Sequence, residues 1–370
     1  MISNAIFHQA NNKILTLCLA FIVAVVCSGF GKREKEQVQA QKIKVGFVTN
    51  GPVNDWGYNY AHDQGRRQME KALEGKVETT VVENVPETAD AERVIERMIK
   101  NRVSLVVATS FGYQDTVYKL AAKYPQVQFA QAWGFKSQPN MGSYSAKMYE
   151  VWYVMGVIAG SMTKTGNLGV VAAHPIPPMK WQINAYVLGA RSVNPKVTAS
   201  VVFINHWFDA TLASDATNSL IEQGADVLTG VLDNSVAVAQ TAEKKGAYVV
   251  GHNVDLSRFA PTHILASTEW LWGNLYTDIA KDVLAKTPLN GKHFTGGLRE
   301  QYAGYTSFST LVPPKVQKAA QAAAEDIRSG RLAVYAGPIS DNQGKLQVEP
   351  GKVLSHDQIM AMDWLVQGVR

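Results

Sequence analysis

The sequence predicts an α/β protein built from two α/β units in tandem. From about residue 42 onward, short runs rich in Val, Ile and Leu alternate with helical patterns, which is typical of parallel sheets covered by helices on both faces. After a long apolar helical stretch at 151–162, the alternation starts afresh at Gly169. A chain of 370 residues is also long enough for two domains of ordinary size.

The first unit is expected to hold four strands separated by helices. Its first strand ends at the turn-rich segment 49–52, and a helical pattern follows. The strands are predicted at 42–48, 77–83, 105–108 and 127–132, and the first two helices at 58–73 and 89–101.

The second unit repeats this order of elements without a detectable sequence repeat. Its strands are predicted at 169–172, 199–204, 227–229 and 248–251, and its helices at 183–192, 214–223 and 236–244. Ligands of open α/β sheets bind beyond the carboxyl ends of the strands. Two such sheets that face each other therefore predict a cleft between them.

Residues 1–27 have the organisation of a secretory signal peptide. A polar start with one lysine is followed by a nearly continuous apolar run at 14–30 and by the charged segment 32–35. Because the apolar run is at the short limit for a membrane-spanning helix, a retained anchor stays open. Residues 28–41 are predicted to be a polar tether.

Both cysteines, Cys18 and Cys27, lie in this leader. Cys27 precedes Ser28 and Gly29, where a bacterial lipoprotein would be cut and lipidated, but Ala-Val-Val at 24–26 departs from the lipoprotein pattern. Lipidation of Cys27 and a simple place in the apolar run therefore both stay open. A chain cleaved there has at most one cysteine, which excludes an intrachain disulfide and a cysteine metal cluster.

Composition and motifs favour a small-molecule binding protein over an enzyme. The net charge of +5 comes from 36 basic and 31 acidic residues without a basic block, so no nucleic-acid partner is expected. The sequence has no phosphate-binding GK[ST] loop, GxSxG elbow, HExxH motif or EF-hand loop. Its histidines lack metal-ligand spacing. We expect no catalytic residue, cofactor or metal, and a monomer.

Aromatic residues alternate with Asp and Asn just after nearly every predicted strand. Such a set fits a flat, neutral heterocycle, because ring faces stack while carboxylates and amides pair with ring and exocyclic nitrogens. A single aromatic there is more often a packing residue, and Asp after a strand is often a helix N-cap, so the prediction rests on recurrence. The clusters lie at 54–59, 109–113, 133–135, 174–178, 205–209, 232–235 and 252–255.

These segments resemble the basic membrane protein family, whose members are substrate-binding proteins of bacterial ABC importers and include purine-nucleoside receptors. Segment 51–59 is similar to the family's Gly-x-x-Asp-Asp-x-Ser-Phe-Asn motif, with Tyr58 at the base-stacking Phe. The resemblance covers residues 42 to about 297. Further similar segments are 111–115, 122–125, 162–166, 175–178 with Asn184, 192–195 and 223–227.

The resemblance implies a two-lobed periplasmic-binding-protein fold of type I, hinged about a central cleft. It implies lobe 1 at 42–148 plus about 268–300 and lobe 2 at 149–267. Beyond the resemblance, we expect residues 301–370 to be a C-terminal extension that packs on the lobes. It also implies a place in the periplasm or on the outer face of the cytoplasmic membrane, with an ABC permease as the partner in the membrane.

Departures from the family pattern bear on the ligand. The family's Gly-Val-Asp-x-Asp strand end, whose first Asp holds ribose hydroxyls, reads Gly-His-Asn-Val-Asp at 251–255. An expected lysine is replaced by Trp270. The resemblance therefore implies a purine-type base such as adenine. A purine nucleoside receptor, a signalling receptor with the same lobes and a nucleoside-acting enzyme remain alternatives.

The expected site has three kinds of residue. Stacking faces are Trp56 and Tyr58, with Trp207, Phe208 or Trp270 opposite. Base-edge partners are Asp233, Asn253 and Asp255, and secondary contacts are Asn184, Ser110 and Gly112. Asp55, Asn59 and Trp133 complete the predicted ligand-binding set.

Overall fold

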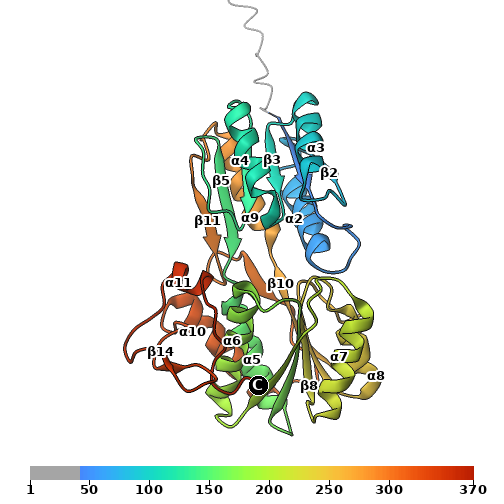
Figure 1. The fold of residues 1–370 in the computed structure, drawn as a ribbon, viewed down its shortest axis with the longest axis vertical. Helices are drawn as coiled ribbons and strands as arrows, with labels where there is room; N and C mark the ends of the chain where they lie inside the picture. Colours follow the sequence, from blue (N-terminus) through green and yellow to red (C-terminus); the bar gives the residue numbers. More distant parts are fainter. Residues whose placement is uncertain (1–41) are drawn as a thin grey trace, which may run out of the picture. The chain divides into compact units, whose positions relative to one another are not determined.

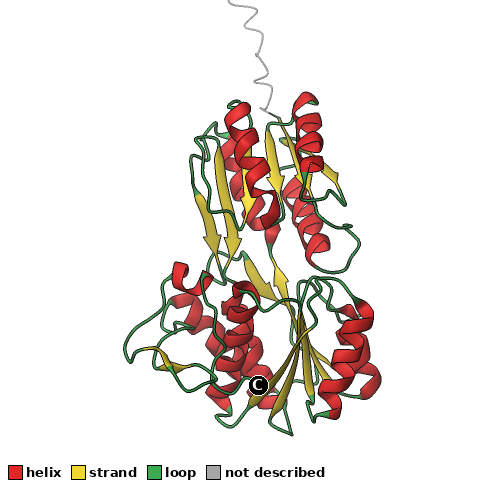
Figure 2. Ribbon diagram, viewed as in Figure 1, coloured by secondary structure: helices red, strands yellow, loops and turns green. Residues whose placement is uncertain are grey.

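Two six-stranded sheets organise residues 42–370, the part of the chain that the computed structural model describes (Figure 1). The predicted signal peptide, tether and lipidation site at Cys27 lie outside the described residues. Helices flank both sheets, as Figure 2 shows. The α/β prediction with two parallel-sheet units is confirmed.

The first sheet is entirely parallel and has the strand order β11-β5-β4-β3-β1-β2. Helices α3 (Ala89–Lys100) and α4 (Gln114–Lys123) share one buried apolar cluster with it, and α2 (Tyr58–Ala72) and α9 (Trp272–Leu284) share another. Burial on both faces explains the continuous apolar runs of its central strands. The strands are β1 (Ile43–Val48), β2 (Val77–Val82), β3 (Leu105–Ala108), β4 (Gln128–Ala132), β5 (Met141–Ala146) and β11 (His293–Gly296).

The second sheet has the order β12-β10-β9-β8-β6-β7 and is parallel except for β12, which runs antiparallel to β10. Its strands are β6 (Asn167–Ala172), β7 (Thr198–Phe203), β8 (Val227–Val231), β9 (Tyr248–Gly251), β10 (Ile264–Trp270) and β12 (Ala303–Tyr305). Its helices are α5 (Met148–Met162), α6 (Pro177–Val193), α7 (Ala210–Glu222), α8 (Val236–Lys245) and α10 (Pro314–Ser329).

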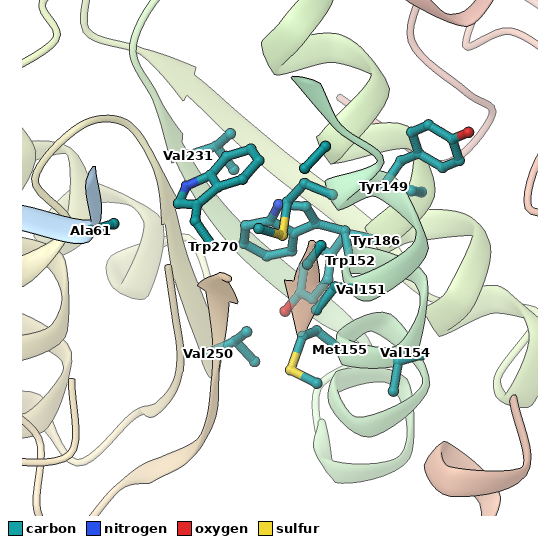
Figure 3. Close-up of a cluster of buried hydrophobic side chains, with 14 of the residues drawn as sticks. Ala61, Tyr149, Val151, Trp152, Val154, Met155, Tyr186, Val231, Val250 and Trp270 are labelled. Carbon is teal, nitrogen blue, oxygen red and sulfur yellow. The ribbon is translucent and has the colours of Figure 1, made fainter. Parts of the chain in front are cut away.

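Helix α5 is apolar on nearly all sides because it is buried on nearly all sides. Figure 3 shows Trp152 of α5 beside Tyr186 of α6, and their ring centroids lie 5.5 Å apart. The two helices approach so closely that a Cβ added at Gly156 would lie 2.0 Å from the Tyr186 carbonyl oxygen. Helix α5 also packs against β10, so this pair of helices is part of the core of the second sheet.

The chain passes between the two sheets at three places within the described residues: at Lys147, at Leu271 and between β11 and β12. Such multiple short connections are where hinged lobes bend. The predicted lobe boundary near 268 falls inside β10, a strand of the second sheet. The expected extension from 301 begins before β12, which also belongs to that sheet.

The last part of the chain packs against the second sheet and its helices. It holds a short hairpin of β13 (Ile339–Ser340) and β14 (Leu346–Val348), followed by α11 (His356–Met360). Ser355 and Gln358 form a capping box at the start of α11. The tail ends along β7, where the amide of Arg370 donates to the carbonyl of Ala199 over 2.9 Å.

Candidate ligand-binding cavity

A cavity of about 930 Å³ lies between the ends of the strands of the two sheets. This volume is at the upper end of the range for pockets that bury small organic ligands. From the first sheet's side it is lined by Asn50, Tyr58, Glu87, Ser110, Gly112 and Trp133, and from the second by Trp207, Leu232, Asp233, His252, Asn253 and Trp270. Eight of these belong to the predicted set: Tyr58, Ser110, Gly112, Trp133, Trp207, Asp233, Asn253 and Trp270.

Three of the aromatic residues, Tyr58, Trp133 and Trp270, form what we call the aromatic box. The Trp133 indole N–H donates to the Tyr58 hydroxyl over 3.0 Å, and that hydroxyl donates to the Thr109 carbonyl over 2.8 Å. The rings of Trp133 and Trp270 meet edge to face, with centroids 5.8 Å apart, as do those of Tyr58 and Trp270 at 6.5 Å. The box is therefore fixed by its own contacts.

Backbone strain marks one wall of the box. Trp133 has φ of 55°, a left-handed conformation that bulky residues rarely adopt. Its backbone amide donates to the Tyr144 carbonyl over 2.8 Å, which helps to hold this conformation. Strained residues of this kind gather at binding sites, where the surrounding structure over-determines them.

Asn253 positions the opposite wall. Its side-chain oxygen accepts from the Trp270 indole N–H over 2.8 Å, and its amide N–H groups donate to the carbonyls of Leu232 and Asp233 over 3.0 and 2.9 Å. With both ends of the amide engaged, Asn253 holds Trp270 and the loop after β8 in place.

Asp233 is the carboxyl group that stands beside the aromatic box. Burial raises its pKa to about 7, with further contributions from the nearby Asp55 and Glu87 carboxylates. Its carboxyl oxygens have no hydrogen-bond partner within residues 42–370, whereas Glu87 accepts from the Ser110 hydroxyl. Near neutral pH the Asp233 carboxyl can therefore act as donor or acceptor toward a ligand.

Six residues of the predicted set do not line the cavity. Asn184 donates to the Trp364 carbonyl and accepts from the Val366 amide, so its side chain holds the C-terminal tail. The Asp255 carboxylate accepts a hydrogen bond from the Ser257 backbone amide at an exposed turn. The Phe208 side chain is 55% exposed to solvent. The remaining three are Asp55, Trp56 and Asn59.

Asp55 and Asn59 order the loop that leads into α2. The Asp55 carboxylate accepts from the backbone amides of Gly57, Asn59 and Tyr60 and from the Asn59 side chain, over 2.8 to 3.1 Å. Burial raises the pKa of Asp55 while these hydrogen bonds lower it. The loop is thereby held in the shape that directs Tyr58 into the cavity.

The same loop touches the second lobe. The Tyr58 amide donates to the Asp233 carbonyl over 3.0 Å, and the Asn234 side chain donates to the Asp55 carbonyl over 2.8 Å. The Trp56 ring stacks on Tyr60 and lies 4.5 Å from the Arg258 guanidinium. We call the contacts of this loop with Asp233, Asn234 and Arg258 the interlobe contact.

Comparison with known proteins assigns the family. A model of the family described as "Bmp: ABC transporter substrate-binding protein PnrA-like" matches residues 42–335. This chain belongs to the Bmp family. The resemblance seen in the sequence is thus confirmed, and the chain is an ABC transporter substrate-binding protein.

Relatives of this Bmp protein include a purine-binding protein of Brucella abortus, 39% identical over 89% of this chain and 93% of the relative. A putative ABC transporter glucose-binding protein of Haloferax volcanii is 34% identical, over 81% of this chain and 75% of its own. Among solved structures, an ABC transporter solute-binding protein of Aeropyrum pernix has a TM-score of 0.68 at 19% identity, covering 86% of this chain and 95% of that one. The fold expected for a type I periplasmic binding protein is confirmed.

Several cavity residues of this Bmp protein carry no local signal in the sequence. Ser143, Ser145 and His293 lie on β5 and β11, two strands that sequence patterning does not predict. His356 comes from the C-terminal segment, far from any predicted strand end. Trp181 lies within α6 and lines the cavity. Its position in the helical sequence pattern does not distinguish a core residue from a cavity residue; only the surrounding structure does.

Within residues 42–370, no cluster of His, Cys, Asp and Glu has the arrangement to hold a metal ion. No helix in that same part of the chain combines the length and apolar character needed to cross a bilayer.

Proposed function

We propose that this Bmp-family protein is exported, binds a purine-type nucleobase, adenine-like, in the aromatic box, and delivers it as a monomer to an ABC permease. The observation that carries the proposal is the Asp233 carboxyl, unpaired within the described residues, with a pKa of about 7 beside three aromatic side chains. The name of the Brucella relative, a purine-binding protein, agrees with it.

The chemistry of Asp233 matches the edge of adenine. That edge sets an exocyclic amino donor beside a ring nitrogen acceptor. A protonated carboxyl group offers an acceptor and a donor side by side, and therefore pairs with both. A pKa near 7 keeps a useful fraction of this form at neutral pH.

The aromatic box supplies the apolar part of the recognition. Tyr58, Trp133 and Trp270 come from both lobes, so a flat base held among them would contact both at once. Each well-placed aromatic pair contributes about 0.5–1.5 kcal/mol beyond the burial of its surface. A ligand that contacts both lobes favours their closed arrangement, which is the form such proteins present to a partner.

A purine nucleoside is the second candidate, and the cavity volume favours it. About 930 Å³ is more space than a single base requires.

A nucleoside-acting enzyme is the remaining alternative. If the protein only binds, incubation with adenosine or inosine followed by chromatography will release no free base, whereas an enzyme will release it.

A thermal-shift panel tests the proposal. Protein freed of bound ligand by unfolding and refolding should be stabilised by adenine more than by D-glucose. Glucose is included because the Haloferax relative is named a glucose-binding protein. The Tyr58→Ala variant should lose this stabilisation. The matched control is Asp255→Ala, an exposed carboxylate outside the cavity lining, which should keep it. Stabilisation by glucose and not by adenine would contradict the proposal.

A further inference from the structure

We propose that the cavity contains a second, polar subsite, formed by Ser143, Ser145, His293 and His356, which takes a neutral hydroxyl-bearing substituent attached to the base. The inference rests on the proposed function, because it extends a ligand whose base lies in the aromatic box. All four residues line the same cavity as the box.

The first three members form a hydrogen-bonded group on the edge of the first sheet. Strands β5 and β11 pair in parallel with His293 opposite Ser143. The two ring nitrogens of His293 lie 2.6 Å from the Ser143 hydroxyl and 3.2 Å from the Ser145 hydroxyl. Both serines are buried, at 8% and 2% exposed, so their hydroxyls are held in fixed positions.

His356 reaches this group from α11, which packs against α6 of the second lobe. Its ring centroid lies 5.8 Å from that of His293. The buried Nδ1 of His356 has no hydrogen-bond partner in the described part of the chain. A buried polar atom without a partner is costly, and a ligand hydroxyl in the cavity would satisfy it.

The charge state of the subsite selects neutral ligands. Burial lowers the pKa of both imidazoles; His356 lowers that of His293 further, and Lys147 that of His356, against the nearby Asp357. Both rings are therefore neutral at pH 7. The nitrogens of His293 are engaged by Ser143 and Ser145, and the Ser145 hydroxyl also lies 3.1 Å from that of Thr295, so the groups left for a ligand are the serine oxygens and the unpaired Nδ1 of His356. Lys136, which also lines this end, is paired with Asp115 over 2.6 Å. Hydroxyl groups match this set, and phosphate does not.

The subsite is continuous with the aromatic box. Gly134 follows Trp133, and a Cβ added to it would lie 3.3 Å from the Cβ of Ser143. A substituent leaving the base would therefore pass Gly134 and reach the serines. Helix α11 lies beyond residues 42–335, so the part of the chain outside the family match supplies one wall of the subsite.

Calorimetry with matched ligands tests the subsite. Two ligand pairs distinguish the attachment point of the hydroxyls: adenosine against 9-methyladenine, and N6-(2-hydroxyethyl)adenine against N6-ethyladenine. In wild type, the hydroxylated member of at least one pair should bind at least fivefold more tightly. His356→Ala should remove that preference while leaving adenine affinity within twofold. His263→Ala, a histidine outside the cavity, is the matched control.

The outcomes separate the two proposals. If adenine binds but no hydroxylated ligand gains affinity, or the gain survives in both His356→Ala and Ser145→Ala, the subsite is wrong and the proposed function stands. If no purine binds at all, the proposed function itself fails. Ser145→Ala also covers the case in which His356→Ala does not fold.

Discussion

The indole rings of Trp270 and Trp272 stack face to face, with centroids 4.9 Å apart and planes 5° from parallel. Trp270 ends β10 of the second sheet, and Trp272 begins α9 on the first. Only Leu271 lies between them, at one of the connections between the lobes. A movement at this connection would change the stack, so the wall of the aromatic box is coupled to the hinge.

Replacing Trp272 should destabilise the fold. Trp272 is fully buried, and it also stacks on His62 with centroids 4.8 Å apart. We expect Trp272→Ala to lower the free energy of unfolding by about 3–5 kcal/mol, as for other large-to-small changes in a core. Urea denaturation measures this free energy, and a loss below about 1 kcal/mol would show that the packing of Trp272 contributes little to the stability of the fold.

The pKa of Asp233 predicts a pH dependence of adenine binding. If the protonated carboxyl pairs with adenine, affinity falls as pH rises through about 7. From pH 6 to pH 8 we expect a loss of about tenfold in wild type. Asp233→Asn keeps a donor and an acceptor, so its affinity should be flat over this range. An affinity that rises with pH in wild type would contradict pairing through the protonated form.

The same group predicts a stability change in the ligand-free protein. Because the folded-state pKa of Asp233 is raised from 3.8 to about 7, its stabilising contribution is complete below about pH 4 and is lost as pH rises through 7. Asp233→Asn should therefore stabilise the protein more at pH 8 than at pH 5. The gain should be on the order of a few kcal/mol, since one pKa unit corresponds to about 1.4 kcal/mol. Equal melting temperatures for wild type and variant at pH 8 would contradict this.

Gly57 should be intolerant of a side chain because of the interlobe contact. A Cβ at this position would lie 1.7 Å from the Asp233 carbonyl oxygen, in the other lobe. We expect Gly57→Ala to keep the lobes apart and to weaken adenine binding at least tenfold. Small-angle scattering should then show compaction by adenine in wild type only. Gly224→Ala strains a left-handed backbone (φ 87°) but places its Cβ where nothing lies within 4 Å, so it is a control for a destabilising glycine replacement away from the interlobe contact. Wild-type affinity in Gly57→Ala would show that the interlobe contact is not needed.

Asn184 should matter for stability and not for the ligand. Two of its hydrogen bonds hold the backbone of Trp364 and Val366, and a third goes to the Met362 sulfur, so Asn184→Ala leaves buried groups unpaired. A loss of about 1–3 kcal/mol is expected, with adenine affinity within twofold of wild type. Chemical denaturation and calorimetry check the two parts, and a selective loss of affinity would place Asn184 at the ligand after all.

Much of the fold could be predicted because both parallel sheets are buried on two faces. Their central strands therefore consist of continuous runs of apolar residues, which are recognisable in the sequence. Strands β5, β10, β11 and β12 were not predicted. Strands β5 and β10 carry Ser, Gly or Thr among their buried residues, and β11 and β12 are edge strands of only four and three residues. The tail strands are too short to give a pattern.

For the site, strand ends located Tyr58, Trp133, Asp233 and Trp270, which the structure brings to one cavity. The same rule also selected Trp56, which faces Arg258 in the interlobe contact. A strand end brings a residue to the correct edge, but the direction of its side chain depends on the opposite lobe. His356 had no such signal, since only tertiary packing brings α11 to the cavity.

The most direct test of the central claim is calorimetric titration of ligand-free protein with adenine, in wild type and Asp233→Ala. We predict one adenine per chain in wild type and at least tenfold weaker binding in Asp233→Ala, with no loss of melting temperature in the ligand-free variant. Absence of adenine binding in wild type, or equal affinity in the two proteins, would contradict the account.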